Sequence, residues 1–266
     1  MKHDRRTLLR FGVYAVPLLF LPKLALADAA SRGREIAEKA DRLTRGFGDM
    51  KAQMIMLLKD RRGQETRREL EASTLETKAG GQKSLVYFNS PRDIRGTALL
   101  THSYPGRDDE QWLYLPAVRR TKRISVTGRS SPFMGSEFAY EDLVTAYPNQ
   151  YDYRFLRDET LRGAECFVVE RYPKYQGTGY KREMVWYDKS EYRIVQIEFF
   201  DAKNRHLKTL SLGGYKQYLD RFWEPTQARM VNHLTRETTE LAWRDYRFHT
   251  GLTENDFSRH ALERAR

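Results

Sequence analysis

The chain has 266 residues and a net charge of +11 at pH 7; 40% of its residues are hydrophobic and 31% are charged. Its single cysteine, Cys166, excludes an intramolecular disulfide, so packing alone must hold the fold together. A basic surface suits nucleic acid, an anionic membrane or an acidic partner, although the excess charge can also serve solubility alone.

Residues 1–27 have the features of an export leader. The basic residues Lys2, Arg5, Arg6 and Arg10 precede an apolar stretch, residues 11–21, that is short for a membrane span. Ala25-Leu26-Ala27 fits the small-x-small rule, which predicts cleavage after Ala27 and a periplasmic mature chain. The paired arginines resemble a twin-arginine signal, so the export route stays open between that route and Sec. The alternative for this segment is a buried N-terminal helix.

Residues 28–266 are expected to form one domain. No linker rich in proline, glycine or serine interrupts them, and removing the five Lys/Arg and one Asp of the leader leaves a net charge of +7. No cysteine directly follows the apolar core of the leader, so the mature protein should carry no lipid anchor. Export makes nucleic acid an unexpected partner, which leaves lipid headgroups and membrane-associated partners.

The first elements of the mature chain are a helix and two strands. Ser31 is a plausible N-cap for a helix over residues 34–43, which Gly46 can end. From Met50 the hydrophobic period changes to two, which predicts a strand with apolar side chains on one face. Residues 64–78 then read as a long, polar strand with charges on both faces.

The remaining chain alternates short strands with turns. Strands are predicted at residues 84–89, 97–104, 111–115, 119–126, 151–157, 166–172, 182–188, 193–201, 206–218, 222–232 and 237–248. Short helices are predicted at residues 137–143 and, capped by Thr253, through Leu262.

The short connections indicate an antiparallel sheet of about ten or eleven consecutive strands. A sheet this wide must curl, which gives a mainly β fold (α+β) shaped as an open half-barrel with short helices over its concave face. Because those helices are too short to fill the hollow, an apolar groove follows.

Alternating apolar rows on the strands are the candidate lining of that groove. Methionine and phenylalanine suit flexible acyl chains because their side chains adapt to irregular shapes. The predicted lining from the strands is Met50, Met54, Met56, Val86, Phe88, Leu113, Leu115, Val195, Ile197 and Phe199. An ordinary closed core is the alternative, and a register error of one residue would exchange the two faces.

Two further segments are candidates for ligand contacts. The basic run Arg119, Arg120, Lys122 and Arg123 can hold an anionic headgroup or partner, or can protect an exposed edge strand. The apolar side chains Phe133, Met134 and Phe138 can form a flap over the groove, with Gly135 permitting an unusual backbone angle, or can anchor their loop.

The sequence offers little that suggests catalysis. Glu137, Glu141 and Asp142 permit an acid–base interpretation, but acidic residues in a first helical turn have a simpler dipole explanation. The histidines lack metal-ligand spacing, so no metal or cofactor is expected. The strand aromatics, including Trp186 and Trp223, permit sugar stacking, although strands are rich in aromatics anyway.

Three consecutive segments carry a resemblance to a known family: Trp112-Leu113-Tyr114-Leu115-Pro116, the run from Arg119 to Ser125, and Phe133-Met134-Gly135-Ser136-Glu137-Phe138 through Tyr140-Glu141-Asp142-Leu143. Weaker likeness extends to residues 93–97 and 257–262. The pattern resembles outer-membrane lipoprotein-sorting proteins of the LolA/LolB-like superfamily, in the branch found beside inner-membrane RND-type exporters.

This resemblance implies a periplasmic half-barrel that carries a lipid or an acylated protein on its concave face. We expect the protein to be a monomer. It also implies an RND-type inner-membrane transporter as donor and transient contact with a membrane surface. The alternative is a non-enzymatic accessory subunit of an RND-type export complex, using the groove for a protein segment.

Overall fold

The computed structural model of the protein describes residues 21–264. Most of the predicted leader, residues 1–20, lies outside the described residues. Helix α1 (Leu21–Leu43) is the longest helix described, and no helix in residues 21–264 is both long and apolar enough to span a membrane. Ser31, predicted as an N-cap, lies inside α1 instead, where its hydroxyl donates to the Asp28 carbonyl.

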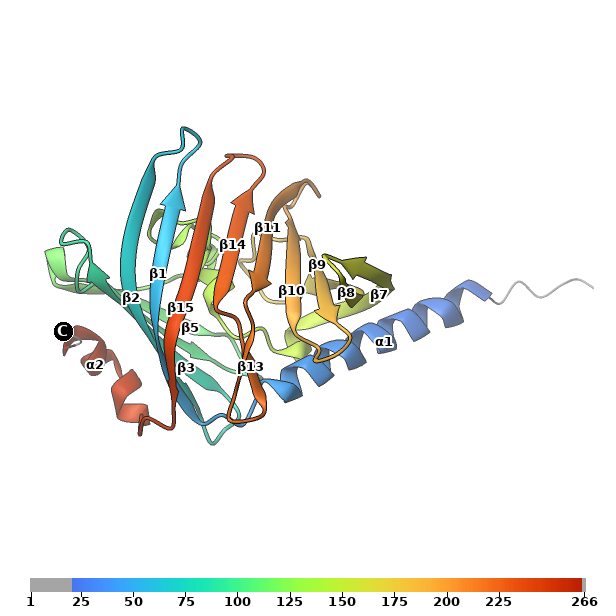
Figure 1. The fold of residues 1–266 in the computed structure, drawn as a ribbon, viewed down its shortest axis with the longest axis horizontal. Helices are drawn as coiled ribbons and strands as arrows, with labels where there is room; N and C mark the ends of the chain where they lie inside the picture. The colour runs from blue at the N-terminus through green and yellow to red at the C-terminus, as the bar shows by residue number, and fades with distance from the viewer. Residues whose placement is uncertain (1–20, 265–266) are drawn as a thin grey trace, which may run out of the picture.

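One curled, antiparallel and unclosed sheet dominates the fold (Figure 1). It contains 13 strands, so the prediction of ten or eleven was too low. The 13 segments predicted individually as strands each contribute one strand to it, the shortest with four residues. The strands are β1 (Asp49–Lys59), β2 (Glu65–Glu76), β3 (Gln82–Ser90), β4 (Ala98–Ser103), β5 (Glu110–Leu115), β6 (Arg120–Arg123), β7 (Tyr151–Leu161), β8 (Ala164–Pro173), β9 (Arg182–Asp188), β10 (Ile194–Phe200), β11 (His206–Gly213), β14 (Gln227–Asn232) and β15 (Thr238–Phe248).

Two strands stay outside this sheet. β12 (Lys216–Tyr218) and β13 (Phe222–Glu224) pair with each other as a small ribbon inserted between β11 and β14. The predicted strands 206–218 and 222–232 are therefore each broken in two. Gly214 has a φ of +63°, a conformation that favours glycine, and it separates β11 from the ribbon.

The chain both enters and leaves the sheet at its centre, through β1 and β15. The strand order is β6-β5-β4-β3-β2-β1-β15-β14-β11-β10-β9-β8-β7, so the first strand pairs with the last. Strands β6 and β7 are consecutive in the chain but form opposite edges of the sheet. Residues 124–150, here called the strap, must therefore run from one edge to the other.

The strap crosses the inner face of the sheet. It contains short 3-10 turns, among them Tyr140–Leu143, which is all that forms of the helix predicted at 137–143. Phe133, 1% exposed, belongs to the main buried cluster together with side chains from both halves of the sheet. The strap is thus part of the core as well as a connection.

The two helices lie on opposite faces of the sheet (Figure 1). Ile36 and Ala40 of α1 join the main inner cluster, whereas Leu262 of α2 (Arg259–Arg264) packs with Leu100 and Trp112 in a separate outer cluster. The prediction that helices cover the concave face therefore holds for α1 and is wrong for α2. Leu262 is fully buried there, so α2 covers part of the outer surface.

Candidate ligand cavity beside helix α1

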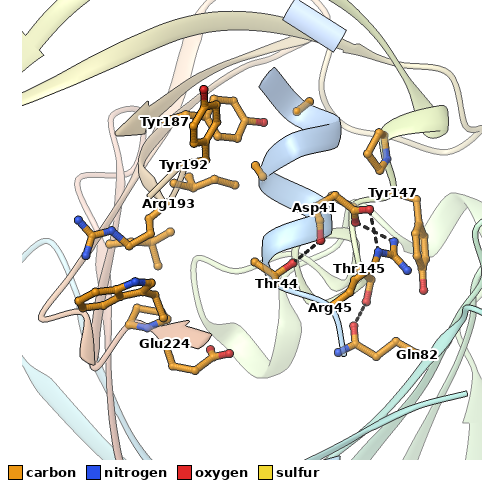
Figure 2. Close-up of a pocket in the computed structure, with 18 of the residues that line it drawn as sticks. Asp41, Thr44, Arg45, Gln82, Thr145, Tyr147, Tyr187, Tyr192, Arg193 and Glu224 are labelled. Carbon is orange, nitrogen blue, oxygen red and sulfur yellow. Dashed lines mark hydrogen bonds and ion pairs between the residues drawn. The ribbon is translucent and has the colours of Figure 1, made fainter. Parts of the chain in front are cut away.

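The inner face is hollow at one end, where a cavity of about 420 Å³ opens beside α1 (Figure 2). This volume lies within the range typical of small-molecule sites. Its walls come from the C-terminal half of α1, the end of the strap at residues 144–148, the sheet, and the β12–β13 ribbon. Segments distant in sequence therefore meet around one opening.

Small side chains on α1 keep this space open. Ile36, Ala37 and Ala40 form the buried stripe of the helix, as expected for helical spacing. Ala37 and Ala40 line the cavity together with apolar groups such as Ile194 and Leu212. Two alanines at this point leave room that larger residues would fill, so the sequence of α1 itself favours a hollow.

The cationic side chains of the cavity wall each have a carboxylate partner. Arg45, two residues beyond the end of α1, donates to the Asp41 carboxylate of α1 at 2.7 Å, and this hydrogen bond raises the pKa of Arg45. Arg193 Nε lies 2.6 Å from the carboxylate of Asp188. The buried Arg171 is paired in the same way with Glu183 at 2.5 Å. No arginine of the lining is thus left to bind an anion on its own.

Two polar groups on β13 are left without partners. The buried indole Nε1–H of Trp223 finds no acceptor within residues 21–264. Glu224 lines the cavity, and no hydrogen bond or ion pair joins its carboxylate to another side chain of the described chain. Burial raises its pKa to about 7. A buried group without a partner is costly, which makes this corner a candidate for contact with a ligand.

The other end of the inner face is filled by the strap. The ring of Phe133 packs against those of Phe88 and Tyr140, with 5.7 Å between centroids in both pairs. Met54 and Met56, 6% and 1% exposed, belong to the same cluster. These predicted groove residues therefore lie in a closed core, which was the alternative interpretation.

Ion pairs and hydrogen bonds fix the strap in this position. Lys208 Nζ lies 2.7 Å from Asp142 Oδ2 and donates to the Glu137 carbonyl. Both charged side chains of that pair are 5% exposed. Arg68 also donates to the Met134 carbonyl at 2.7 Å. The predicted flap is therefore a buried, many-times anchored segment in this structure.

The predicted groove residues divide into three groups. Met50 is the one that lines the cavity. Val86, Leu113, Leu115, Met134, Phe138, Ile197 and Phe199 join Met54, Met56, Phe88 and Phe133 in the inner cluster. Val195 packs instead on the outer face with Cys166, Val168 and Trp186.

The prediction for Val195 was wrong because of a β-bulge. Ile194 pairs with Tyr187, whereas Gln196 pairs with Trp186, so Val195 is an extra residue on β10. The bulge restores Ile197 to the inner face but leaves Val195 on the outer one. Period-two counting across the bulge places one side chain on the wrong face.

The predicted basic cluster lies at the edge of the sheet. Arg119, Arg120, Lys122 and Arg123 are all exposed, and none of them lines the cavity. Arg120 and Lys122 stand opposite Leu115 and Leu113, and Arg123 stands opposite Trp112, so the run is divided between the two faces. Its role in binding a headgroup or partner remains a prediction.

The carboxylates considered for acid–base catalysis hold the strap. Glu137 accepts a hydrogen bond from Asn232 at 2.6 Å. Glu141 accepts from the backbone N–H of Gly179 at 2.8 Å and from the Tyr175 hydroxyl at 3.2 Å, while burial raises its pKa to about 7. No cluster of three or more metal-ligating side chains occurs among the described residues. These contacts hold the strap against the sheet.

Sequence reasoning missed most of the cavity wall. Trp223 was noted only as a strand aromatic, and Glu224 and Arg193 were not singled out. Their signal was faint: Phe222-Trp223-Glu224-Pro225 places an acidic residue and a proline in what read as a continuous apolar strand.

Comparison with known proteins supports the fold and the family. A family model described only as an uncharacterized protein matches residues 80–264. A solved outer membrane lipoprotein-sorting protein domain from Vibrio parahaemolyticus is 45% identical, with a TM-score of 0.86 over 88% of this chain and 99% of that one. A DUF1329 family protein from Desulfovibrio piger is 28% identical, with a TM-score of 0.84 over 88% and 99%.

A LolA superfamily protein from Nitrosomonas europaea shares the fold, at 20% identity and a TM-score of 0.69 over 86% and 98% of the two chains. The search of curated proteins found no match. The length and identity of the Vibrio match, together with the sheet topology, decide the assignment. The chain belongs to the outer-membrane lipoprotein-sorting protein family and shares the fold of a LolA superfamily protein.

Proposed function

We propose that this protein is a non-enzymatic periplasmic carrier that shields the acyl part of a lipid or lipid-modified molecule between the inner and outer membranes. The cavity beside α1 is the observation that carries this proposal. It is a hollow on the inner face of a curled sheet, walled by apolar side chains of α1 and the strands. The membership in a lipoprotein-sorting family supports the same conclusion.

Transfer of hydrocarbon out of water supplies the binding energy. Each buried methylene contributes about 0.8 kcal/mol, so a chain of several methylenes held in the cavity gives useful affinity without any covalent step. Because a single acyl chain binds membranes only reversibly, such a carrier can also release its cargo to an acceptor membrane. A carrier of this kind needs an apolar cavity with an opening, and the cavity beside α1 has both.

The partners proposed for this function rest on the family resemblance. An RND-type inner-membrane transporter is the proposed donor, the protein acts as a monomer, and the exposed basic edge at Arg120 and Lys122 makes transient contact with anionic lipid. Cleavage after Ala27 is proposed to release the mature chain into the periplasm.

Native mass spectrometry of protein isolated from the periplasm tests the carrier function, with bound lipid as the expected result. Ala40→Phe, which places a ring in the cavity, is expected to abolish the lipid-bound species. Ala30→Phe, at an exposed position on the same helix, should leave it intact.

Thermal unfolding of both variants must show that they fold, because overpacking can destabilise a core. Leu212→Trp fills the same cavity from β11 and serves as the second variant. Recovery of lipid-free wild-type protein, or equal lipid occupancy in all of these proteins, would contradict the proposal. Co-purification with a transporter but without lipid would favour the accessory-subunit alternative.

A further inference from the structure

The charge balance of the cavity is the starting point for a further inference. Arg45, Arg171 and Arg193 are each neutralised by a carboxylate at 2.7 Å or less. Among the acids of the lining, Glu76 accepts hydrogen bonds from the backbone N–H groups of Gly46 and Gly48. When the partners Glu183 and Asp188 are counted, five acids face three arginines around the cavity, so the charge excess there is negative although the whole chain is basic.

Glu224 is the acidic group of the wall whose carboxylate is free to contact a ligand. Its carboxylate points toward the middle of the cavity, whereas the guanidinium of Arg193 points away from it (Figure 2). No other side chain within residues 21–264 donates a hydrogen bond to it. The acidic groups that interact with it electrostatically are the phenols of Tyr215, Tyr218 and Tyr246, none of which brings a positive charge.

Aromatic rings surround this corner. Tyr215 and Trp223 line the cavity, and the guanidinium of Arg193, itself paired with Asp188, already lies over both rings, 5.1 and 4.6 Å from their centroids. Aromatic walls of this kind accept cations. Because no cation of the described chain pairs with the Glu224 carboxylate itself, this corner is complementary to an amine cation and not to an anionic headgroup.

The unpartnered indole of Trp223 adds a second requirement. Its Nε1–H is a donor only, so a matching ligand must present an acceptor oxygen beside the group that meets Glu224. A polar end that carries an ammonium group and an oxygen meets both conditions. The hydrocarbon part then lies along the apolar wall formed by Ala37, Ala40 and Leu212.

Building on the proposed carrier function, we propose that this cavity selects lipids whose polar end is a primary ammonium group with a neighbouring oxygen acceptor. Glu224 provides the counter-ion, and Trp223 donates a hydrogen bond to the oxygen. This assigns headgroup selection to the interior of the cavity. The arginine-rich edge of the sheet has no part in it.

Binding of three amphiphiles with one chain length tests the selection, by isothermal titration calorimetry below their micelle concentrations. The probes are decylammonium, decanol and decanoate. Wild-type protein is expected to bind decylammonium about tenfold more tightly than decanol, since a hydrogen bond to a charged group supplies at least this discrimination. Decanoate should bind most weakly, because it brings a second anion to Glu224.

Glu224→Gln keeps the shape of the side chain and removes its charge. It should lower the affinity for decylammonium about tenfold, leave that for decanol within about twofold, and raise that for decanoate. Glu240→Gln, at an exposed surface pair with Arg229, is the matched control and should change none of the three.

Trp223→Phe tests the oxygen contact separately. An amino alcohol of the same chain length should bind wild-type protein more tightly than decylammonium, and this advantage should disappear in the variant. Equal binding of the three decyl probes, or a decylammonium affinity that Glu224→Gln leaves unchanged, would overturn the headgroup selection while the carrier function stands. Failure of every probe to bind would overturn both.

Discussion

The two ends of the inner face of the sheet are covered in different ways. At one end the strap inserts Phe133 against Phe88, and the core is closed. At the other end α1 presents Ala37 and Ala40, and a cavity remains. The comparison shows that a curled sheet does not by itself make a binding site. Whether a cavity remains depends on the size of the side chains that the covering segment places against the inner face.

The comparison also separates two uses of charge. The strap end contains a buried, fully satisfied pair of Lys208 and Asp142. The cavity end contains the unpartnered carboxylate of Glu224. Buried polar groups that have hydrogen-bond partners hold a segment in place. A buried polar group without a partner lowers stability, and a ligand that supplies the partner removes this loss. The following substitutions test this division.

Phe133→Ala should have the largest effect, since it hollows the filled end. Removal of a buried phenylalanine costs about 3–5 kcal/mol of unfolding free energy, measured by urea denaturation. If the variant folds, it should also bind more lipid than wild-type protein, because the two ends become alike. Phe133→Leu, which keeps most of the volume, should cost much less. A loss under about 1 kcal/mol for Phe133→Ala would show that the strap does not complete the core.

Lys208→Met should follow at about 3 kcal/mol, because it leaves Asp142 buried without its cation. Denaturation midpoints and slopes give the difference. Arg229→Met breaks an exposed pair with Glu240 and should change stability by less than about 1 kcal/mol. Equal effects of the two substitutions would argue against the strap as a buried, ion-paired anchor.

Glu224→Gln should change the pH dependence of stability. Because the folded-state pKa of Glu224 is raised to about 7, the folded protein holds a proton that the unfolded chain releases near its ordinary value of 4.5. Wild-type stability from this group therefore falls as pH rises from about 4.5 to 7.

The variant should be more stable than wild type by roughly 3 kcal/mol at pH 8, with the gap closing toward pH 4.5. Unfolding measured across this range checks the sign. A gap that is constant with pH would show that Glu224 titrates normally.

Leu212→Ala should have the smallest effect on stability. Leu212 borders space that is already empty, so we expect a loss of about 1 kcal/mol or less. The same substitution at Leu70, 1% exposed in the inner cluster, should cost about 2–5 kcal/mol. Similar losses at both positions would mean that the cavity end is packed as tightly as the strap end.

The sequence predicted the strands well and the site poorly, for physical reasons. Period two identified segments such as β1 because one face of each strand is buried. It could not reveal the bulge at Val195, which leaves no trace in composition. It also gave no sign that β1 pairs with β15, because pairing across the whole chain has no local signature.

The candidate site escaped prediction because its walls come from elements far apart in the chain. The Phe133 segment was recognised as special, but whether it covers a groove or fills it depends on partners such as Lys208, which lies 66 residues from Asp142. The sequence could not identify Glu224, because its distinguishing feature is the lack of hydrogen-bond and ion-pair partners around its buried carboxylate. Only three-dimensional packing shows such a lack.

The pairing of β1 with β15 has a consequence for how the chain acquires its structure. Residues near Met54 can pair across the middle of the sheet only with residues near Trp243, which come much later in the chain. Proteins dominated by such distant pairings fold in milliseconds to seconds, well behind helical proteins of similar stability. Because β15 is the last strand to be synthesised, the edges of β1 and β14 that pair with it stay unpaired until the end of synthesis. Until then, these edges are exposed to association with other chains.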